Sequence, residues 1–387
     1  MDRRNSAAYG ASWTKSTCKK AVTQHYSRPC QRRLIYDNIN TSRYREKIMS
    51  FRLRKYALAS IAAAASLGVT SMASAQIDMK IGYPTTADPQ HDYAVKFVAE
   101  VNKRTNGRVK GRVFPTSQLG KIPRQIEAIQ LGTQEGFFAP PGFLQGVNKA
   151  FQVADVPGFF ADHAHAHRTL NVPRFKNPFN SLGVDKGILS GSLWVYDGAS
   201  YMATKPIAKL ADFKGLKIRV LATEIERKGV ATLGATGVPI PFTSVVPSLQ
   251  RKVVDGARTS LVVAAKAKFP TVTKHLTITN DYYIPCISAF SIKFLDKLSK
   301  EDRATVLKVS DELGHWASAR SQSFVDKMIV EWKKTGATVS YLPPEEQKLH
   351  MSRLAPLADE VFGKNKNPTI RKLYAVLKEE AQRMDVR

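Results

Sequence analysis

Between residues 80 and 139, short apolar runs alternate with segments whose apolar residues recur every three or four positions. The runs at 80–83, 108–114 and 136–139 predict strands, and the periodic segments at 94–101 and 122–131 predict helices between them. A repeated strand–helix–strand order joins parallel strands through crossover helices. This part of the chain is therefore predicted to form a parallel sheet covered by helices, which places the protein in the α/β class.

The second half of the chain adds further predicted strands, at 188–195, 201–204, 217–220, 253–256, 276–279 and 287–293. Thr223 and Glu226 form the Thr-x-x-Glu pattern of a capping box, which predicts a helix start between two of these strands. Beyond residue 299 the pattern predicts helices, at 300–335, 344–362 and 368–384. An unbroken helix over 300–335 is about 54 Å long at 1.5 Å per residue, so we expect it to bridge two lobes.

The longest apolar stretch, residues 57–69, is too short for a membrane span of about 20 residues. Arginine and lysine precede it, and Ala73-Ser74-Ala75 follows it. Charged, apolar and small-residue regions in this order are typical of a secretory signal, so we predict a signal peptide at 49–75 and a mature protein outside the cytoplasm. Since an export signal has to lie at the N-terminus, we expect Met49 to be the native start and residues 1–48 to be an overextended beginning.

The net charge of +27 would indicate a nucleic-acid partner if the cations formed a compact basic block. They are unevenly distributed, because residues 1–56 hold 14 Lys and Arg against three acids. The remaining cations are spread along the chain. We therefore predict a solvated basic surface and no nucleic-acid partner.

Two other patterns are candidates for enzyme chemistry. Residues 162–167 read Asp-His-Ala-His-Ala-His, but on a helix only His163 and His167 share a face, and no further ligand pattern completes a zinc site. Cys286 lies in an apolar segment, where a buried, inert thiol is the commoner case. We interpret the histidines as a helix start and predict no metal, no other cofactor and no enzyme activity. An exported metal-dependent hydrolase that uses the histidines is the alternative.

Arg219 is the main candidate for ligand binding. In the predicted strand 217–220, Ile218 and Val220 point to one face and Arg219 to the other. Arg219 lies near the carboxyl end of the strand, where open α/β sheets bind ligands, and its guanidinium can donate two parallel hydrogen bonds to a carboxylate. An exposed arginine at a strand end gives the same pattern, so the strand alone leaves both interpretations open.

Several segments, in order along almost all of residues 78–385, carry a family resemblance. Phe-Pro-Thr-Ser-Gln-Leu-Gly ends the segment 107–120, and Leu-Ala-Asp-Phe-Lys-Gly-Leu-Lys-Ile-Arg-Val fills 210–220. Further matching segments lie at 131–133, 157–167, 233–235, 241–242 and 249–256. Together they resemble the periplasmic solute-binding proteins of tripartite ATP-independent (TRAP) transporters, the DctP-like family.

This resemblance implies a two-lobe α/β periplasmic binding protein with a hinge and a long helix bridging the lobes. It also implies a receptor that captures a small organic acid, as its carboxylate, between the lobes and delivers it to the TRAP permease subunits of the inner membrane. We expect the first lobe to span 76–198 with 287–325, and the second lobe to span 199–286 with 326–387.

The same resemblance points to the site residues. Arg219 matches the arginine that pairs with the ligand carboxylate, and Phe242 matches an aromatic residue in the same cleft. After Asp-Gly the family runs Gln-Glu-Asn-Pro, whereas residues 257–260 read Ala-Arg-Thr-Ser, which puts Thr259 at the position of a ligand-contacting asparagine. A second ligand-facing arginine, frequent in the family, is absent from 198–203. The predicted ligand-binding residues are Arg219, Phe242, Thr259, Arg258, Ser200, Tyr201 and Pro140.

The signal-peptide prediction can be tested on the secreted protein. We expect cleavage between Ala75 and Gln76, because the small residues Ala73 and Ala75 suit the cleavage site. Intact mass spectrometry of periplasmic material should therefore give Gln76 as the first residue. A secreted species that retains residues 1–48 would contradict both the cleavage site and the start at Met49.

Overall fold

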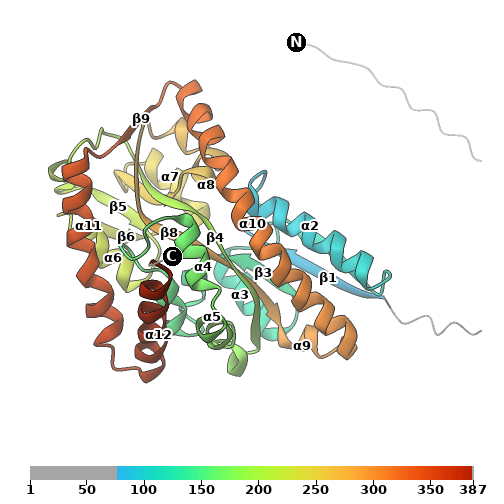
Figure 1. Ribbon diagram of the computed structural model, residues 1–387. Coiled ribbons are helices and arrows are strands. Elements are labelled where there is room, and N and C mark those ends of the chain that lie inside the picture. The colour runs from blue at the N-terminus through green and yellow to red at the C-terminus, as the bar shows by residue number, and fades with distance from the viewer. Residues whose placement is uncertain (1–75, 386–387) are drawn as a thin grey trace, which may run out of the picture. The chain divides into compact units, whose positions relative to one another are not determined.

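The computed structural model describes residues 76–385, so the predicted signal peptide at 49–75 and the predicted extra segment 1–48 lie outside the described residues. The described part contains a nine-stranded mixed sheet with the order β2-β1-β3-β8-β4-β7-β5-β6, in which β9 also pairs with β8. Helices pack around this sheet (Figure 1). None of the described helices has the length and apolar character that crossing a membrane requires.

The first half of the sheet is parallel. β1 (Ile77–Gly82) pairs with β2 (Val109–Phe114) on one side and with β3 (Gly136–Ala139) on the other. The crossovers are α2 (Pro89–Arg104) and α3 (Ile122–Leu131). This is the predicted strand–helix–strand order, and α3 and β3 occupy the predicted residues.

The start of α2 shows how the sequence specifies these helices. Pro89 opens the first turn, where its missing N–H is no loss, and the Asp88 carboxylate accepts a hydrogen bond from the His91 backbone N–H at 2.9 Å. Phe97 and Val101 are buried in the core that includes β1. The predicted apolar stripe therefore faces the sheet.

The second half is also parallel, with β5 (Lys217–Val220) between β6 (Thr236–Pro239) and β7 (Gly256–Ser260). Its helices are α6 (Glu224–Ala231), α7 (Val245–Gln250) and α8 (Leu261–Lys266). The strand predicted at 253–256 is wrong, because β7 begins only at Gly256. Val253 lies exposed in the turn after α7, so its apolar character does not mark a strand.

The capping box predicted at Thr223 is also wrong, although α6 does begin there. The Thr223 side chain makes no capping hydrogen bond. The Glu226 carboxylate accepts a hydrogen bond from the Leu221 backbone N–H at 2.7 Å and pairs with Arg258 at 3.2 Å. A tertiary ion pair therefore takes the side chain that the local pattern assigned to a cap.

Two long antiparallel strands, β4 (Ile188–Ala203) and β8 (His275–Ser291), join the halves. The strand predicted at 188–195 is part of β4, the one at 201–204 extends one residue beyond its end, and those at 276–279 and 287–293 overlap β8. Their register shifts three times between Ser190 and Ser200. Gly198 lies in this irregular stretch, where a Cβ would overlap the Asn280 side chain.

The long helix predicted at 300–335 is present as α10 (Lys300–Lys334). The Ser299 hydroxyl caps it by accepting a hydrogen bond from the Asp302 backbone N–H at 3.0 Å. α10 runs past α2 and β4, and also contacts α8 and β9 (Thr338–Tyr341) (Figure 1). It therefore contacts helices of both halves of the sheet, as expected for a bridging helix.

The remaining helices are α4 (His163–Leu170), α5 (Pro173–Asn180), α9 (Ile292–Leu295), α11 (Pro344–Ala358), a π-helical turn (Asp359–Gly363) and α12 (Pro368–Asp385). α11 contacts α6, whereas α12 contacts α4 and α5. After α10 and α11, helix α12 therefore packs against helices that precede β4 in the chain. The lobe borders stay a prediction, in which α12 is assigned to the second lobe although its contacts lie with α4 and α5.

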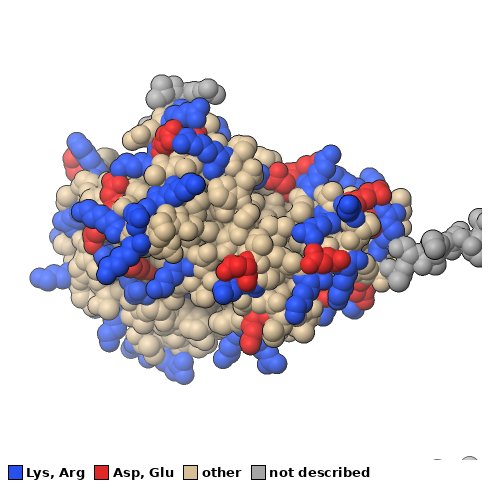
Figure 2. All heavy atoms as spheres, turned by 90° about the horizontal axis from the view of Figure 1, so that it is seen from below, with Lys and Arg blue, Asp and Glu red and all other residues tan. Residues whose placement is uncertain are grey.

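Lysine and arginine side chains are scattered over the face shown in Figure 2, with acidic side chains among them. Elsewhere in the described residues, cations also take part in exposed ion pairs, such as Lys378 with Asp359 at 2.7 Å and Arg174 with Glu379 at 2.7 Å. On this face, the positive charge is mixed with negative charge, as the sequence predicted for a solvated basic surface.

A buried hydroxyl cluster ties the long strands to the helices. The Tyr93 hydroxyl of α2 lies 2.6 Å from the Ser288 hydroxyl, 3.1 Å from Ser192 and 3.0 Å from Ser310. These serines belong to β8, β4 and α10. One tyrosine therefore connects four elements through hydrogen bonds that are shielded from water.

Replacing Tyr93 with phenylalanine tests this connection. We expect Tyr93→Phe to lower the free energy of unfolding by about 1–3 kcal/mol, because buried serine hydroxyls lose a partner while the ring is retained. Urea unfolding measures the change. Tyr341→Phe is the control, since Tyr341 is 60% exposed and should tolerate the same deletion. Equal stability of the two variants would show that the cluster contributes nothing.

Candidate functional site

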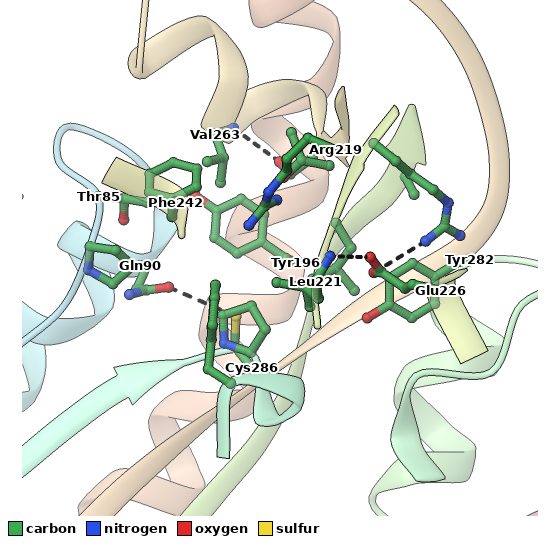
Figure 3. Close-up of a pocket in the computed structure, with 18 residues that line it drawn as sticks. Thr85, Gln90, Tyr196, Arg219, Leu221, Glu226, Phe242, Val263, Tyr282 and Cys286 are labelled. Carbon is green, nitrogen blue, oxygen red and sulfur yellow. Dashed lines mark hydrogen bonds and ion pairs between the residues drawn. The ribbon is translucent and has the colours of Figure 1, made fainter. Parts of the chain in front are cut away.

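A pocket lies between the two halves of the sheet, with about 570 Å³ of space free of protein atoms, its open mouth included. The first half, the second half and both long strands contribute to its wall (Figure 3). The lining residues are Pro84, Thr85, Gln90, Pro140, Phe143, Tyr196, Ala199, Arg219, Leu221, Glu226, Phe242, Arg258, Thr259, Ser260, Val263, Tyr282, Ile284 and Cys286.

Arg219 is the cation that this pocket leaves without a counter-ion. Its side chain comes from β5, which is held on both sides by β6 and β7, and the residue is 2% exposed. Its Nε donates a hydrogen bond to the Ile240 carbonyl at 3.0 Å, whereas the buried Nη2 has no partner among the described residues. The guanidinium points into the pocket (Figure 3).

The charge of Arg219 is costly in this position. Burial lowers the pKa of its guanidinium to about 10, and the more distant Glu226 opposes that shift only in part. The side chain therefore remains charged at neutral pH. A buried, charged guanidinium with an unused N–H donor is suited to bind an anion, and a carboxylate fits its planar fork.

Apolar side chains surround this cation. Phe242 follows Pro241 just beyond the end of β6 at Pro239, and Leu221 follows β5 directly. Phe143 comes from the opposite half of the sheet. These three residues and Arg219 also line an adjoining pocket, so the two spaces meet at the guanidinium. Apolar walls around a charge exclude water and strengthen its interaction with a bound anion.

The second arginine of the pocket, Arg258, is in a different situation. It pairs with Glu226 at 3.2 Å and with Asp281 at 3.2 Å, and its guanidinium lies 4.8 Å from the centre of the Tyr282 ring. His350 also contacts Asp281, at 2.8 Å. Burial alone would raise the pKa of Asp281, but Arg258 and His350 hold it at about 2. Two carboxylates therefore already neutralise Arg258.

Asp155 lies beside this network as a protonated acid. Burial, followed by the nearby charge of Glu226, raises the pKa of Asp155 to about 8. The Tyr282 hydroxyl donates a hydrogen bond to its Oδ1 at 2.7 Å, which opposes the shift. The carboxyl group is therefore mostly neutral at pH 7 and adds little negative charge near Glu226.

Five of the seven predicted site residues, namely Pro140, Arg219, Phe242, Arg258 and Thr259, line the pocket. The other two, Ser200 and Tyr201, are buried in β4 outside it. Tyr201 packs edge-on against Phe213 and lines a small adjoining cavity. In this stretch of β4, Ala199 is the residue that reaches the wall. The ligand contacts themselves remain a prediction.

Sequence reasoning missed Gln90, Glu226 and Tyr282 as parts of the wall. Glu226 had a local signal, its place in the apparent capping box, but that signal indicated a different role. Cys286 is buried in β8 as predicted, and burial raises the pKa of its thiol well above the usual range. Its place in the pocket wall was not predicted, because no spacing rule links it to Arg219.

The histidines at 162–167 form a helix start, as predicted. Asp162 caps α4 by accepting a hydrogen bond from the His165 backbone N–H at 2.6 Å. His163 and His165 contact backbone carbonyls at 3.2 and 3.0 Å, and His167 lies 2.9 Å from His315. Within residues 76–385, no group of three or more His, Cys, Asp or Glu side chains is arranged to hold a metal ion.

A pocket between two sheet halves that are joined by long strands is typical of a binding protein for a small molecule. The chain belongs to the bacterial extracellular solute-binding proteins of family 7, the DctP family, whose family model matches residues 82–365. Its members include the periplasmic solute-binding proteins of TRAP transporters. The predicted family is thereby confirmed. Because this is a family of binding proteins, the alternative of a metal-dependent hydrolase is set aside.

Individual relatives agree with this assignment. A solute-binding protein of Verminephrobacter eiseniae is 30% identical over 76% of this chain and 88% of its own length. The 2,3-diketo-L-gulonate-binding periplasmic protein YiaO of Escherichia coli is 29% identical over 75% of this chain and 88% of its own. A crystal structure of a TRAP periplasmic solute-binding protein from Desulfovibrio salexigens, with bound orotic acid, superposes with a TM-score of 0.76. It is 25% identical and covers 80% of this chain and 100% of that one. The predicted two-lobe fold is confirmed.

Asp155 gives a test by pH. Its pKa rises from 3.8 to about 8 on folding, so between these values the folded protein holds a proton that the unfolded chain releases. This group therefore makes the free energy of unfolding fall as the pH rises from about 4 to about 8. We expect Asp155→Asn, measured by urea unfolding, to lose less stability over that range than the wild type.

The matched control is Asp185→Asn, because the Asp185 side chain is 71% exposed. This control should follow the wild-type pH dependence. If Asp155→Asn follows it as well, Asp155 does not carry a raised pKa in the folded protein.

Proposed function

We propose that this protein is the extracytoplasmic receptor of a TRAP transporter and that it captures a small organic acid by pairing the acid's carboxylate with Arg219. The observation that carries the proposal is the buried Nη2 of Arg219, which has no partner and faces the pocket. A buried cation is stabilised most by an anion whose oxygens can accept its hydrogen bonds, as carboxylate oxygens do.

Known ligands of similar proteins support this chemistry. The names of two relatives record 2,3-diketo-L-gulonate and orotic acid as ligands, and both compounds are carboxylic acids. Arg219 offers a carboxylate site without help from a second cation. Arg258 serves the protein itself through Glu226 and Asp281.

Closure of the two lobes is the proposed step of capture. Pro140 and Phe143 contact the ligand space from one half of the sheet, and Arg219 and Phe242 contact it from the other. β4 and β8 are the segments that join the halves, and their irregular register makes them the proposed hinge. Closure removes the Arg219–carboxylate pair from water, so the attraction between the two charges strengthens.

Delivery follows from the family and from the predicted signal peptide. The exported protein would act in the periplasm, bind its acid there and present the closed complex to the membrane permease subunits. We propose the lobe borders given by the sequence for this movement, 76–198 with 287–325 and 199–286 with 326–387. The long helix α10 would then span both lobes.

Replacing Arg219 tests the proposal. We expect Arg219→Ala to weaken binding by about thirty-fold to several thousand-fold, because truncating one member of a buried charge pair costs about 2–5 kcal/mol. Arg219→Lys should recover part of the loss, since lysine restores the charge but not the planar fork. Titration calorimetry with the tightest binder from a thermal-shift panel of small carboxylic acids measures both variants.

Arg112→Ala is the control, because the Arg112 side chain is 58% exposed and pairs with Asp78 on the surface. It should bind like the wild type. Neither Arg219 variant should lower the melting temperature of the ligand-free protein by much, because the side chain serves the ligand. Wild-type affinity in a folded Arg219→Ala variant would remove the carboxylate anchor.

A further inference from the structure

We infer that the ligand of this protein is a monocarboxylate rather than a dicarboxylate. This inference rests on the proposed function and narrows its ligand class. Two observations carry it: the number of unneutralised cations among the described residues of the pocket, and the fixed carboxylate of Glu226 in its wall.

The charges of the pocket leave room for one carboxylate. Among the described residues that line the pocket and the space adjoining it at Arg219, the cations are Arg219 and Arg258. Arg258 is neutralised by Glu226 and Asp281, both at 3.2 Å and both buried. Arg219 has no carboxylate within ion-pair distance. A second carboxylate on the ligand would therefore find no free cation.

Glu226 makes a second carboxylate less favourable still. One of its oxygens pairs with Arg258, and the other accepts the Leu221 backbone N–H at 2.7 Å (Figure 3). Both oxygens are thus held in place in the wall. An additional anion near this fixed carboxylate would be both repelled and desolvated, and a buried charge without a partner is strongly disfavoured.

Two hydroxyl groups of the wall are available to a ligand. The Thr85 and Tyr196 hydroxyls line the pocket, are buried and have no hydrogen-bond partner among the described residues. The Gln90 amide instead donates to the Phe138 carbonyl at 2.8 Å, and the Ser260 hydroxyl accepts the Val263 backbone N–H at 2.9 Å. The wall can therefore satisfy a neutral polar group of the ligand, but it offers no second free cation for another carboxylate.

The rest of the wall is apolar. Phe242, Leu221 and Val263 come from the second half, and Phe143 and Pro140 from the first. Such a surface favours methylene or aromatic carbon where it contacts the ligand. The site as a whole therefore combines a single carboxylate anchor with a mostly apolar wall and two free hydroxyl groups.

Matched ligands of one chain length test the charge argument. Hexanoate and adipate have the same number of carbon atoms, and they differ in a second carboxylate. We expect calorimetry on the wild-type protein to show hexanoate binding tighter than adipate, by on the order of tenfold or more. Butyrate against succinate, and benzoate against phthalate, repeat the comparison on other skeletons. Hexanamide, which lacks the charge, should not bind.

The outcomes separate this inference from the proposed function. Tighter binding of the dicarboxylates would overturn the inference and leave a carboxylate receptor. If none of the acids binds, or if hexanamide binds as well as hexanoate, the proposed carboxylate function fails and the inference fails with it. The wild-type comparison decides these cases without any variant.

Glu226→Gln tests the charge argument directly. Loss of this carboxylate removes the repulsion and leaves Arg258 with Asp281 as its remaining partner. The preference for hexanoate over adipate should then shift toward adipate, by on the order of tenfold. Glu360→Gln is the matched control, since Glu360 pairs with Lys228 in an exposed ion pair, and it should leave the ratio unchanged. A folded Glu226→Gln variant with an unchanged ratio would refute the role of Glu226.

Discussion

Burial of a guanidinium without a carboxylate is an expensive arrangement, and much of the structure around Arg219 serves to maintain it. β6 and β7 fix the strand that bears the residue, and the Ile240 carbonyl accepts its Nε–H, which sets the direction of the planar group. Glu226, the nearest acid that influences Arg219, is held by Arg258. If Glu226 were free to pair with Arg219, the pocket would lose its unpaired cation.

The two buried arginines of the pocket have different roles, one in the candidate binding site and one in the structure behind it. Arg219 and Arg258 lie on neighbouring parallel strands and are both buried. Arg258 has two carboxylate partners, and through Asp281 it is linked to His350 of α11. Its role is to hold α6, β7, β8 and α11 together behind the pocket. The chemistry of the side chain is the same in both cases, and only the partners distinguish the functions.

Apolar periodicity and end signals in the sequence predicted those elements whose residues follow such local patterns throughout. α3, β3 and β5 occupy the predicted residues, and α10 differs by one residue, because apolar periodicity and flanking glycine or serine mark their ends. The continuity of β4 and β8 could not be predicted in this way. Asp197 and Asp281 interrupt the apolar pattern, yet both are buried in the strands, and Asp281 is stabilised there by distant partners. Arg219 could be predicted as a site residue, because its strand and the family resemblance both indicate it. The places of Glu226 and Tyr282 in the pocket wall could not be predicted, because they depend on partners far along the chain.

The long strands also determine the order in which the molecule can be assembled. β3 pairs with β8, so that Phe137 lies opposite Ala289, and β4 pairs with β8 along most of its length. The sheet therefore cannot be completed until residues far along the chain have been synthesised. Pairing between such distant segments is slow, because closing a large loop costs entropy before any stabilising contact forms. During folding, the strands that pair with β8 therefore stay unpaired for longer than the strands of a sheet built from local hairpins.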